Sequence, residues 1–258
     1  MRPAVALAVR VRARWPLPLG PAVAVLGWHR VDVEGGGLAV SPARFTRQMD
    51  LLDEHRQHCP VTRLDQVAGF LASGERHSRR VVLTFDDAWA DNHANALGPL
   101  SQHHLPAILY VPSRLLGQPG YMTRTQLLEM DDAGVTIGAH SRTHPDLRAC
   151  SPGNLEREVR GSKEDLEDLL AKPVTSFAYP TGLTDERVQA AVAAAGFTSA
   201  VTTCPGWWRP ATKPLEIPRS FVENFSDATF VAAMAGGLNV LGPVGAVKTG
   251  LMPWRGRS

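Results

Sequence analysis

Cysteine is scarce in this chain of 258 residues, which has three: Cys59, Cys150 and Cys204. They are far apart and odd in number, whereas a scaffold held by disulfides needs a denser, even set. The sequence therefore excludes a disulfide framework and favours a reducing compartment. Long apolar runs are also missing, because no uninterrupted stretch approaches the ~20 residues of a membrane-spanning helix. We expect no span.

An excess of charge of either sign is absent too, with 27 basic against 25 acidic side chains and a formal net charge of +2. Such a balance gives no broad field for gripping a polyanion, so nucleic acid is not an expected partner. The apolar run 4–9 is interrupted by Arg10, Arg12 and Arg14, which argues against a cleavable signal peptide. We expect a cytoplasmic protein, with a peripheral membrane contact through the basic start left open.

Short runs of β-branched and apolar residues alternate with segments of helical period along nearly the whole chain. This alternation is typical of a parallel sheet with crossover helices. Expected strands cover residues 22–26, 81–85, 107–111, 135–139, 174–178, 197–203 and 216–221. Helices are expected to start at Ser41-Pro42 and Ser151-Pro152, to run through Leu97 and over 126–132, and to extend from a Thr184 cap to Ala195 before Gly196.

About seven strands with intervening helices and no linker predict a single α/β domain, a distorted (β/α)7 barrel over residues 21–235. A basic extension (1–20) and a Gly-rich tail (236–258) flank this domain. The carboxyl ends of barrel strands carry the chemistry of such folds, so polar residues directly after strands become the candidates for a site.

Asp86 and Asp87 directly follow the expected strand 81–85. Taken alone, they could equally be a helix cap and a solvated carboxylate. His140 and His144 follow the expected strand 135–139, and imidazoles four residues apart on one turn can share a metal ion. Two surface histidines near a turn are the alternative. Two histidines and a carboxylate at strand ends form an open site for a divalent cation.

With these motifs the sequence resembles a known family, the polysaccharide deacetylases of the NodB homology type, which are also called carbohydrate esterase family 4. Three segments carry the likeness, which runs from about Ala22 to Phe221: Thr84-Phe85-Asp86-Asp87, His140-Ser141-Arg142-Thr143-His144 and Phe177-Ala178-Tyr179-Pro180-Thr181-Gly182. Membership implies a distorted seven-stranded barrel and metal-dependent removal of acyl groups, usually acetyl, from an amino sugar.

The resemblance also implies roles for individual residues. Asp87, His140 and His144 would bind the metal, Asp86 would be the general base, and the backbone amide of Thr181 would face the oxyanion. Two histidines and one carboxylate favour Zn²⁺, with Co²⁺, Ni²⁺ and Mn²⁺ as alternatives.

A general acid is needed for the leaving amine, and histidine has the appropriate pKa. Many relatives place it near the C-terminus, but this chain has no histidine beyond His144. Gly27-Trp28-His29-Arg30-Val31 resembles a segment of the circularly permuted branch that includes poly-N-acetylglucosamine deacetylases. His29 is therefore the candidate acid, and a structural histidine is the alternative.

Two positions depart from the family pattern. Ala88 stands where the family usually has glycine, and a left-handed backbone there would cost about 1 kcal/mol. Ala178 replaces an arginine thought to orient the base. Arg219, in Ile217-Pro218-Arg219, is a candidate substitute partner for Asp86, and a surface arginine is the alternative.

Aromatic residues supply the remaining candidates for substrate contact. Trp207 and Trp208 could stack on sugar faces or be buried packing, and Tyr179 belongs to the third family segment. Trp89 is expected to pack at the barrel mouth. The other histidines, for which the pattern shows no partner, are taken as solvated: His55, His58, His77, His93, His103 and His104.

These observations predict a metal-dependent hydrolase that removes N-acetyl groups from an N-acetylated saccharide, either a polysaccharide or a glycoconjugate. A glycan-binding pseudoenzyme on the same fold is one alternative, and a deacylase or deformylase of another amide is a second. The sequence does not specify the sugar, the chain length or the oligomeric state.

Overall fold

The computed structural model describes residues 20–34, 36–75 and 78–235, and its centre is a curled parallel sheet. Seven strands follow one another across this sheet in the order β8-β7-β6-β5-β4-β1-β9, and every pairing is parallel. The strands are β1 (Ala22–Trp28), β4 (Arg79–Phe85), β5 (Ala107–Val111), β6 (Thr136–Ala139), β7 (Ser176–Ala178), β8 (Ser199–Val201) and β9 (Ser220–Phe221). Two further strands, β2 (Arg30–Val31) and β3 (Ala39–Val40), form a small separate pair.

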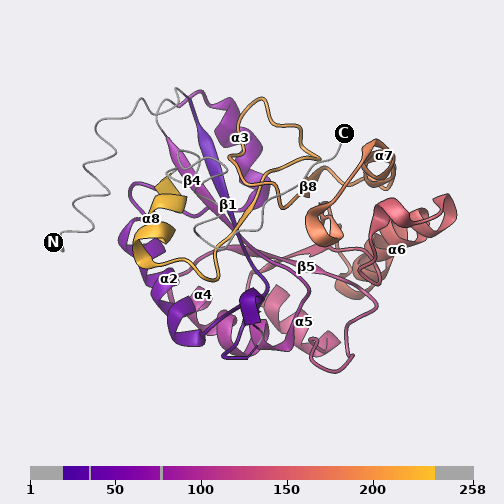
Figure 1. The fold of residues 1–258 in the computed structure, drawn as a ribbon, viewed down its shortest axis with the longest axis horizontal. Coiled ribbons are helices and arrows are strands. Elements are labelled where there is room, and N and C mark those ends of the chain that lie inside the picture. Colours follow the sequence, from indigo (N-terminus) through magenta and orange to yellow (C-terminus); the bar gives the residue numbers. More distant parts are fainter. Residues whose placement is uncertain (1–19, 35, 76–77, 236–258) are drawn as a thin grey trace.

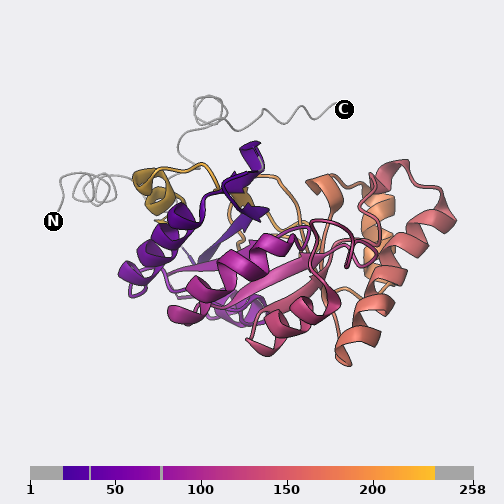
Figure 2. The same cartoon turned by 90° about the horizontal axis from the view of Figure 1, so that it is seen from below.

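Helices cover the outside of this sheet, except for one whose buried side chains Val67, Phe70 and Leu71 join an apolar cluster inside the curl. They are α2 (Pro42–Glu54), α3 (Val67–Ala72), α4 (Leu97–Gln102), α5 (Arg124–Asp132), α6 (Pro152–Leu170), α7 (Glu186–Ala194) and α8 (Asp227–Ala235). Figure 1 shows β1 and β4 crossing the middle of the molecule, with α2, α4 and α8 on one side and α6 and α7 on the other. Figure 2 shows the same helices from below, along the sheet.

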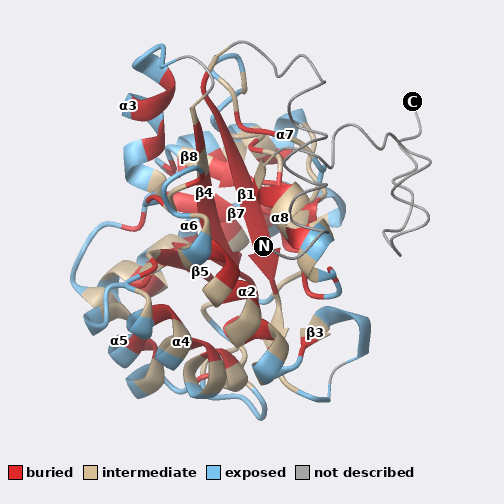
Figure 3. Ribbon diagram, turned by 90° about the vertical axis from the view of Figure 1, so that its left-hand side faces the viewer, coloured by how far each residue is buried: buried red, intermediate tan, exposed pale blue. Residues whose placement is uncertain are grey.

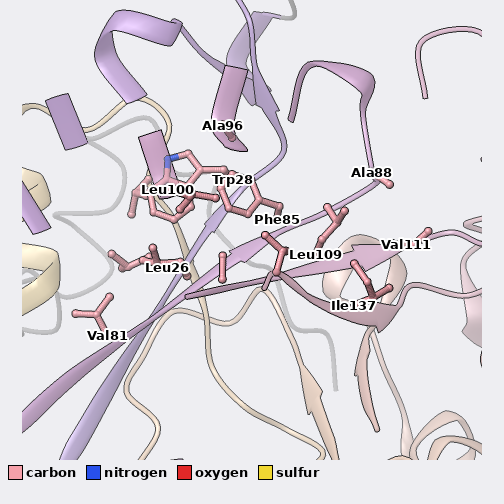
Figure 4. Close-up of a cluster of buried hydrophobic side chains, with 14 of the residues drawn as sticks. Leu26, Trp28, Val81, Phe85, Ala88, Ala96, Leu100, Leu109, Val111 and Ile137 are labelled. Carbon is pink, nitrogen blue, oxygen red and sulfur yellow. The ribbon is translucent and has the colours of Figure 1, made fainter. Parts of the chain in front are cut away.

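The strands separate two apolar clusters because their side chains alternate between the two faces of the sheet. In β1, Ala24, Leu26 and Trp28 join the larger cluster beneath the helices, whereas Val23 and Val25 join a smaller one inside the curl. Figure 3 shows the strands buried and the helices exposed on their outer faces. Figure 4 shows part of the larger cluster, in which the Trp28 and Phe85 rings stack 5.5 Å apart.

The segment 217–221 brings the two edges of the sheet together. Ile217 pairs with Val201 of β8, and Ser220 and Phe221 pair with β1. One short segment therefore contains β9, the last strand of the row, and pairs with β8, the first strand, which closes the curl into a distorted barrel.

Arg219 lies within this closing segment and is fully buried. Its guanidinium forms a bidentate pair with Asp86, Nη1 to Oδ1 and Nη2 to Oδ2, both at 2.6 Å. The Tyr110 ring lies 5.7 Å from the guanidinium carbon, and a side chain on Gly138 would collide with that ring at 2.6 Å. Glycine at 138 therefore makes room for the aromatic support of the ion pair.

The expected strands and the barrel class are confirmed, with shifted ends. The Thr184 cap is wrong by one residue, because Asp185 accepts the Val188 N–H at 2.8 Å and α7 begins at Glu186. After β4 the chain forms a π-helical turn, η3 (Asn92–Ala96), before α4. Helices α3 and α8 were not expected.

The expected basic extension and Gly-rich tail, and His77, lie outside the described residues except for Gly20. Among the residues described, no helix has both the length and the apolar character needed to cross a membrane.

Ala88 has a left-handed backbone (φ 56°), a conformation that glycine, the usual residue of the family at this position, adopts readily. Its methyl group is 1% exposed and belongs to the larger apolar cluster (Figure 4). Burial of a methyl group contributes about 0.8 kcal/mol, which offsets much of the cost of the left-handed conformation.

We expect Arg219→Met to lower the free energy of unfolding by about 3–5 kcal/mol near neutral pH, because Asp86 would keep a buried charge without its partner. In the native protein, burial raises the pKa of Asp86. The charges of Arg219, His140 and His29 outweigh this effect and lower the pKa to about 2. The stability that this shift provides is present above the ordinary carboxyl pKa and is lost as the pH falls towards 2. In the variant, burial raises the pKa instead.

The difference in the free energy of unfolding between Arg219→Met and wild type should therefore narrow as the pH falls through the raised pKa of Asp86 in the variant, where this carboxylate takes up a proton. It should narrow further as the pH falls towards 2 and wild type loses its own contribution. Denaturant unfolding at a series of pH values measures this. Arg219→Lys keeps the positive charge but not the two parallel hydrogen bonds of the guanidinium, so its free energy of unfolding should fall by less. A loss for Arg219→Met that is equal at pH 7 and pH 3 would contradict the assignment.

Ala88→Gly should change the free energy of unfolding by less than about 1 kcal/mol. Relief of the left-handed strain is offset by the loss of the buried methyl group and by the greater freedom of glycine in the unfolded chain. Chemical denaturation of the two proteins measures the difference, and a stabilisation of several kcal/mol would mean that Ala88 strains the turn.

Candidate active site

Polar residues gather beyond the carboxyl ends of the strands. Asp86 and Asp87 follow β4, His140 follows β6, His29 follows β1, and Glu223 comes two residues after β9. Since neighbouring parallel strands end at the same edge, residues far apart in sequence meet here. The candidates named from strand ends therefore face one another across the mouth of the barrel.

Asp87, His140 and His144 each offer a ligand atom to one small volume, within 4.8 Å of one another. Asp87 Oδ1 lies 3.6 Å from His140 Nε2 and 3.5 Å from His144 Nε2. These separations exceed a hydrogen bond, so the three atoms surround a point that a cation could occupy. The expected ligand set is brought together.

The tautomer of His140 suits a metal ligand. Its Nδ1 donates to the carbonyl of Ala178 at 2.7 Å, which leaves the lone pair on Nε2 directed towards Asp87. Burial lowers the pKa of His140 against the opposing effect of the Asp86 and Asp87 charges. A neutral imidazole with a fixed orientation is the form that binds metal ions.

The charges around Asp87 also fit a cation. Asp86 is paired with Arg219, whereas Asp87, with 17% of its side chain exposed, contacts two imidazoles and an indole. Among the residues that the structure describes, no Lys or Arg pairs with Asp87, and a half-buried carboxylate in such surroundings would gain most from a bound cation. The residues present therefore fit a divalent metal ion.

His29 has a partner that the sequence reasoning missed. Its Nδ1 lies 2.9 Å from Glu223 Oε1, the same oxygen accepts the His29 backbone N–H at 3.1 Å, and the ring stacks on Phe221 at 4.3 Å. Burial lowers the pKa of His29, but the Glu223 hydrogen bond and the charges of Asp86, Glu223 and Asp87 outweigh it and raise the pKa. Glu223 follows the last expected strand, so the strand-end rule could have found it.

Thr181 lies in the turn after β7, with a left-handed backbone (φ 60°) and an exposed side chain. It comes three residues after Ala178, whose carbonyl holds His140. This turn therefore begins beside the cluster.

Three candidate substrate contacts do not join the cluster. The Tyr179 ring is fully buried and its hydroxyl donates to the Leu215 carbonyl at 3.0 Å. Trp208 exchanges backbone hydrogen bonds with Val23, near the amino end of β1, and both Trp207 and Trp208 are at least nine-tenths buried. For Trp207 and Trp208 this burial favours packing over sugar stacking, the two alternatives that the sequence left open, because the polar cluster lies at the other end of β1.

Two of the histidines taken as solvated have carboxylate partners instead. His103 lies 3.0 Å from Asp50, and His93 lies 2.6 Å from Glu129. Partners of this kind lie on neighbouring helices, so sequence spacing gave no sign of them.

Acidic residues of α6 hold the loop that carries the two ligand histidines. Glu158 accepts the backbone N–H groups of Arg142 and Thr143, both at 2.9 Å, and Asp165 pairs with the Arg142 guanidinium at 2.8 and 3.0 Å. Ser141 and His144 are left-handed, so these contacts offset backbone strain. In the sequence, Glu158 and Asp165 look like any charges on an amphipathic helix.

Comparison with known proteins points to one family. Residues 73–200, about half of the chain, match the family model described as polysaccharide deacetylase. A Bacillus subtilis protein named for this family, YxkH, is 26% identical over 183 residues, which are 70% of this chain and 64% of that protein. The chain thus spans less than two thirds of that relative's length.

Two further comparisons extend beyond the matched region. A Staphylococcus epidermidis protein named poly-beta-1,6-N-acetyl-D-glucosamine N-deacetylase is 24% identical over 236 residues, 85% of this chain and 79% of that protein. The structure of the Streptococcus pyogenes deacetylase PplD, in complex with acetate, has a TM-score of 0.76 and 25% identity, and covers 83% of this chain and 98% of that one. The chain belongs to the polysaccharide deacetylase family.

Proposed function

We propose that this protein is a metal-dependent hydrolase that removes acetyl groups from the amino groups of an N-acetylated saccharide. One observation carries the proposal: three metal-ligand atoms lie within 4.8 Å of one another, and the Asp86–Arg219 and His29–Glu223 pairs border them. Amide hydrolysis needs an electrophile, a base and an acid at one place, and these groups can supply all three.

Asp87, His140 and His144 would hold the ion, and their two nitrogens and one oxygen favour Zn²⁺ over harder cations. Co²⁺, Ni²⁺ and Mn²⁺ are the alternatives. A cation bound there would polarise the amide carbonyl and lower the pKa of water.

Asp86 would receive a proton from the attacking water. Since its pKa is about 2, the carboxylate stays ionised at neutral pH, and Arg219 fixes its orientation through both oxygens. Each carboxylate oxygen keeps a second lone pair for the water. A base this weak can take a proton only from a water molecule whose own pKa is lowered, and a cation on the ligand trio would lower it. Asp86 would therefore act as a base only together with the ligand trio.

His29 would protonate the departing nitrogen. Glu223 holds Nδ1, which leaves Nε2 as the position for the transferable proton, and the raised pKa keeps the imidazole charged closer to neutral pH. The backbone amide of Thr181 is our candidate donor to the oxyanion, supported by the family resemblance and by the adjacent turn.

Release of acetate from defined saccharides tests the activity. We select β-1,6-linked N-acetylglucosamine oligomers, because a relative is named for that substrate, and chitin oligomers as a second linkage. Binding without acetate release would favour a glycan-binding pseudoenzyme. Turnover only of formyl or non-sugar amides would favour the other alternative.

His140→Ala and His144→Ala should each weaken metal binding by more than the ~10- to 100-fold that outer-shell changes cost, and acetate release should fall with it. The reason is that each variant keeps only two of the three protein ligands of the metal ion. Metal content after dialysis and the metal dissociation constant measure the effect. His93→Ala, which alters a pair with Glu129 away from the ligand trio, is the matched control. Full metal occupancy in both ligand variants would refute the trio.

Activity should fall as the pH rises through the pKa of His29, because the acid must be protonated. Glu223→Gln removes the hydrogen bond to a carboxylate and its charge, so the pKa of His29 should drop and the alkaline limb of the rate profile should move to lower pH. Glu216→Gln, on the same terminal segment but paired with Lys213, should leave the limb in place.

His29→Ala should bind the metal as wild type does and lose about 10²- to 10⁴-fold in turnover. If its turnover stays near wild type, or if Glu223→Gln leaves the alkaline limb unmoved, His29 is a structural residue.

A further inference from the structure

Trp89 connects to the ligand trio through the oxygen of Asp87 that faces away from the histidines. Its indole Nε1–H donates to Asp87 Oδ2 at 3.2 Å, while Oδ1 faces His140 Nε2 and His144 Nε2. The two oxygens of this carboxylate therefore have separate neighbours, an N–H donor on one side and the Nε2 atoms of two imidazoles on the other.

The indole itself is held in place from several directions. The Tyr121 ring stacks on it at 4.4 Å with an interplanar angle of 18°, and the Arg30 guanidinium lies 5.0 Å from its centroid. Arg30 is in turn anchored by Asp91 and Asp32, both at 2.8 Å. Rotation of Trp89 away from Asp87 would break the stacked arrangement.

The backbone around Trp89 is braced as well. Residues 117–122, which we call the bracing loop, pair with the turn after β4: Met122 N–H donates to Ala88 O and Ala90 N–H donates to Gly120 O, both at 2.9 Å. Trp89 and Tyr121 form an antiparallel bridge. This bracing matters because Asp87 and Ala88 are both left-handed, at φ 72° and 56°, and a strained turn stays in place only where its surroundings fix it.

We propose that Trp89 is a positioning residue that reserves Asp87 Oδ2, so that Asp87 binds the metal ion through Oδ1 alone. Hydrogen bonds to the second atom of a ligand group orient that group and tune its affinity for metal. This inference rests on the proposed metal site and adds a residue that the ligand set does not include.

Trp89→Phe tests this, because phenylalanine keeps an aromatic ring for Tyr121 and Arg30 but has no N–H. The dissociation constant for Zn²⁺ should rise about 10- to 100-fold. With Co²⁺ as the probe, release of Oδ2 as a second ligand should raise the coordination number and weaken visible absorption. Trp208→Phe, an equal change at the other end of β1, should leave the dissociation constant and the spectrum as in wild type.

The wild-type protein gives a second measurement, should Trp89→Phe fold poorly. The chain has six tryptophans, and one indole N–H resonance should shift on addition of Zn²⁺. If Zn²⁺ moves none of them, the proposal is overturned.

The proposal that Trp89 reserves Asp87 Oδ2 would also be overturned if Trp89→Phe had the Zn²⁺ affinity and the Co²⁺ spectrum of wild type. If the variant changed only in a raised KM, Trp89 would be a substrate contact instead. If wild type binds neither ion, the proposed metal site itself fails. A titration of the wild-type protein with Zn²⁺ and Co²⁺ therefore distinguishes this outcome from one in which only the proposed role of Trp89 is wrong.

Discussion

The ion pair between Arg219 and Asp86 lies where the two ends of the sheet meet, and both the fold and the site depend on it. Arg219 belongs to the segment that pairs with β8 at Ile217 and with β1 at Ser220 and Phe221. Asp86 directly follows β4, the third strand from the β9 end of the row. A buried pair of this kind need not add net stability, yet loss of one partner is costly, so the pair fixes how the curl closes.

Closure of the barrel also brings the last functional residues to the mouth. Phe221 and Glu223 come two and four residues after Arg219; Phe221 stacks on the ring of His29, and Glu223 accepts from its Nδ1. Gly27 permits this approach, since a Cβ there would lie 2.8 Å from the Phe221 ring. The contact that orients Asp86 and the contact that raises the pKa of His29 thus come from one stretch of chain, which couples the acid and base ends of the site.

The sequence was sufficient for the strands, the barrel class and the strand-end residues, because alternation and strand-end position are local patterns. Asp86, Asp87, His140 and His29 were found in this way. Glu158, Asp165 and the carbonyl of Ala178 were not, since a charge on a helix and a backbone oxygen carry no mark of their tertiary partners. The role of Trp207 and Trp208 stayed open in the sequence, because residue type alone does not distinguish an exposed ring that stacks on a sugar from a ring buried in packing. The same holds for Tyr179, whose ring is buried.

Left-handed residues at Asp87, Ala88, Ser141, His144 and Thr181 surround the site. Each costs of order 1–3 kcal/mol, so the turns would relax unless outside contacts fixed them. The contacts are of two kinds: acidic residues of α6 hold the histidine loop, and the loop 117–122 holds the aspartate turn. The charge of Asp87 is a second unfavourable contribution, because within the described part of the chain this carboxylate faces two imidazoles and pairs with no Lys or Arg. A bound cation would offset that contribution, which ties the strain in the turns to the chemistry we propose for the site.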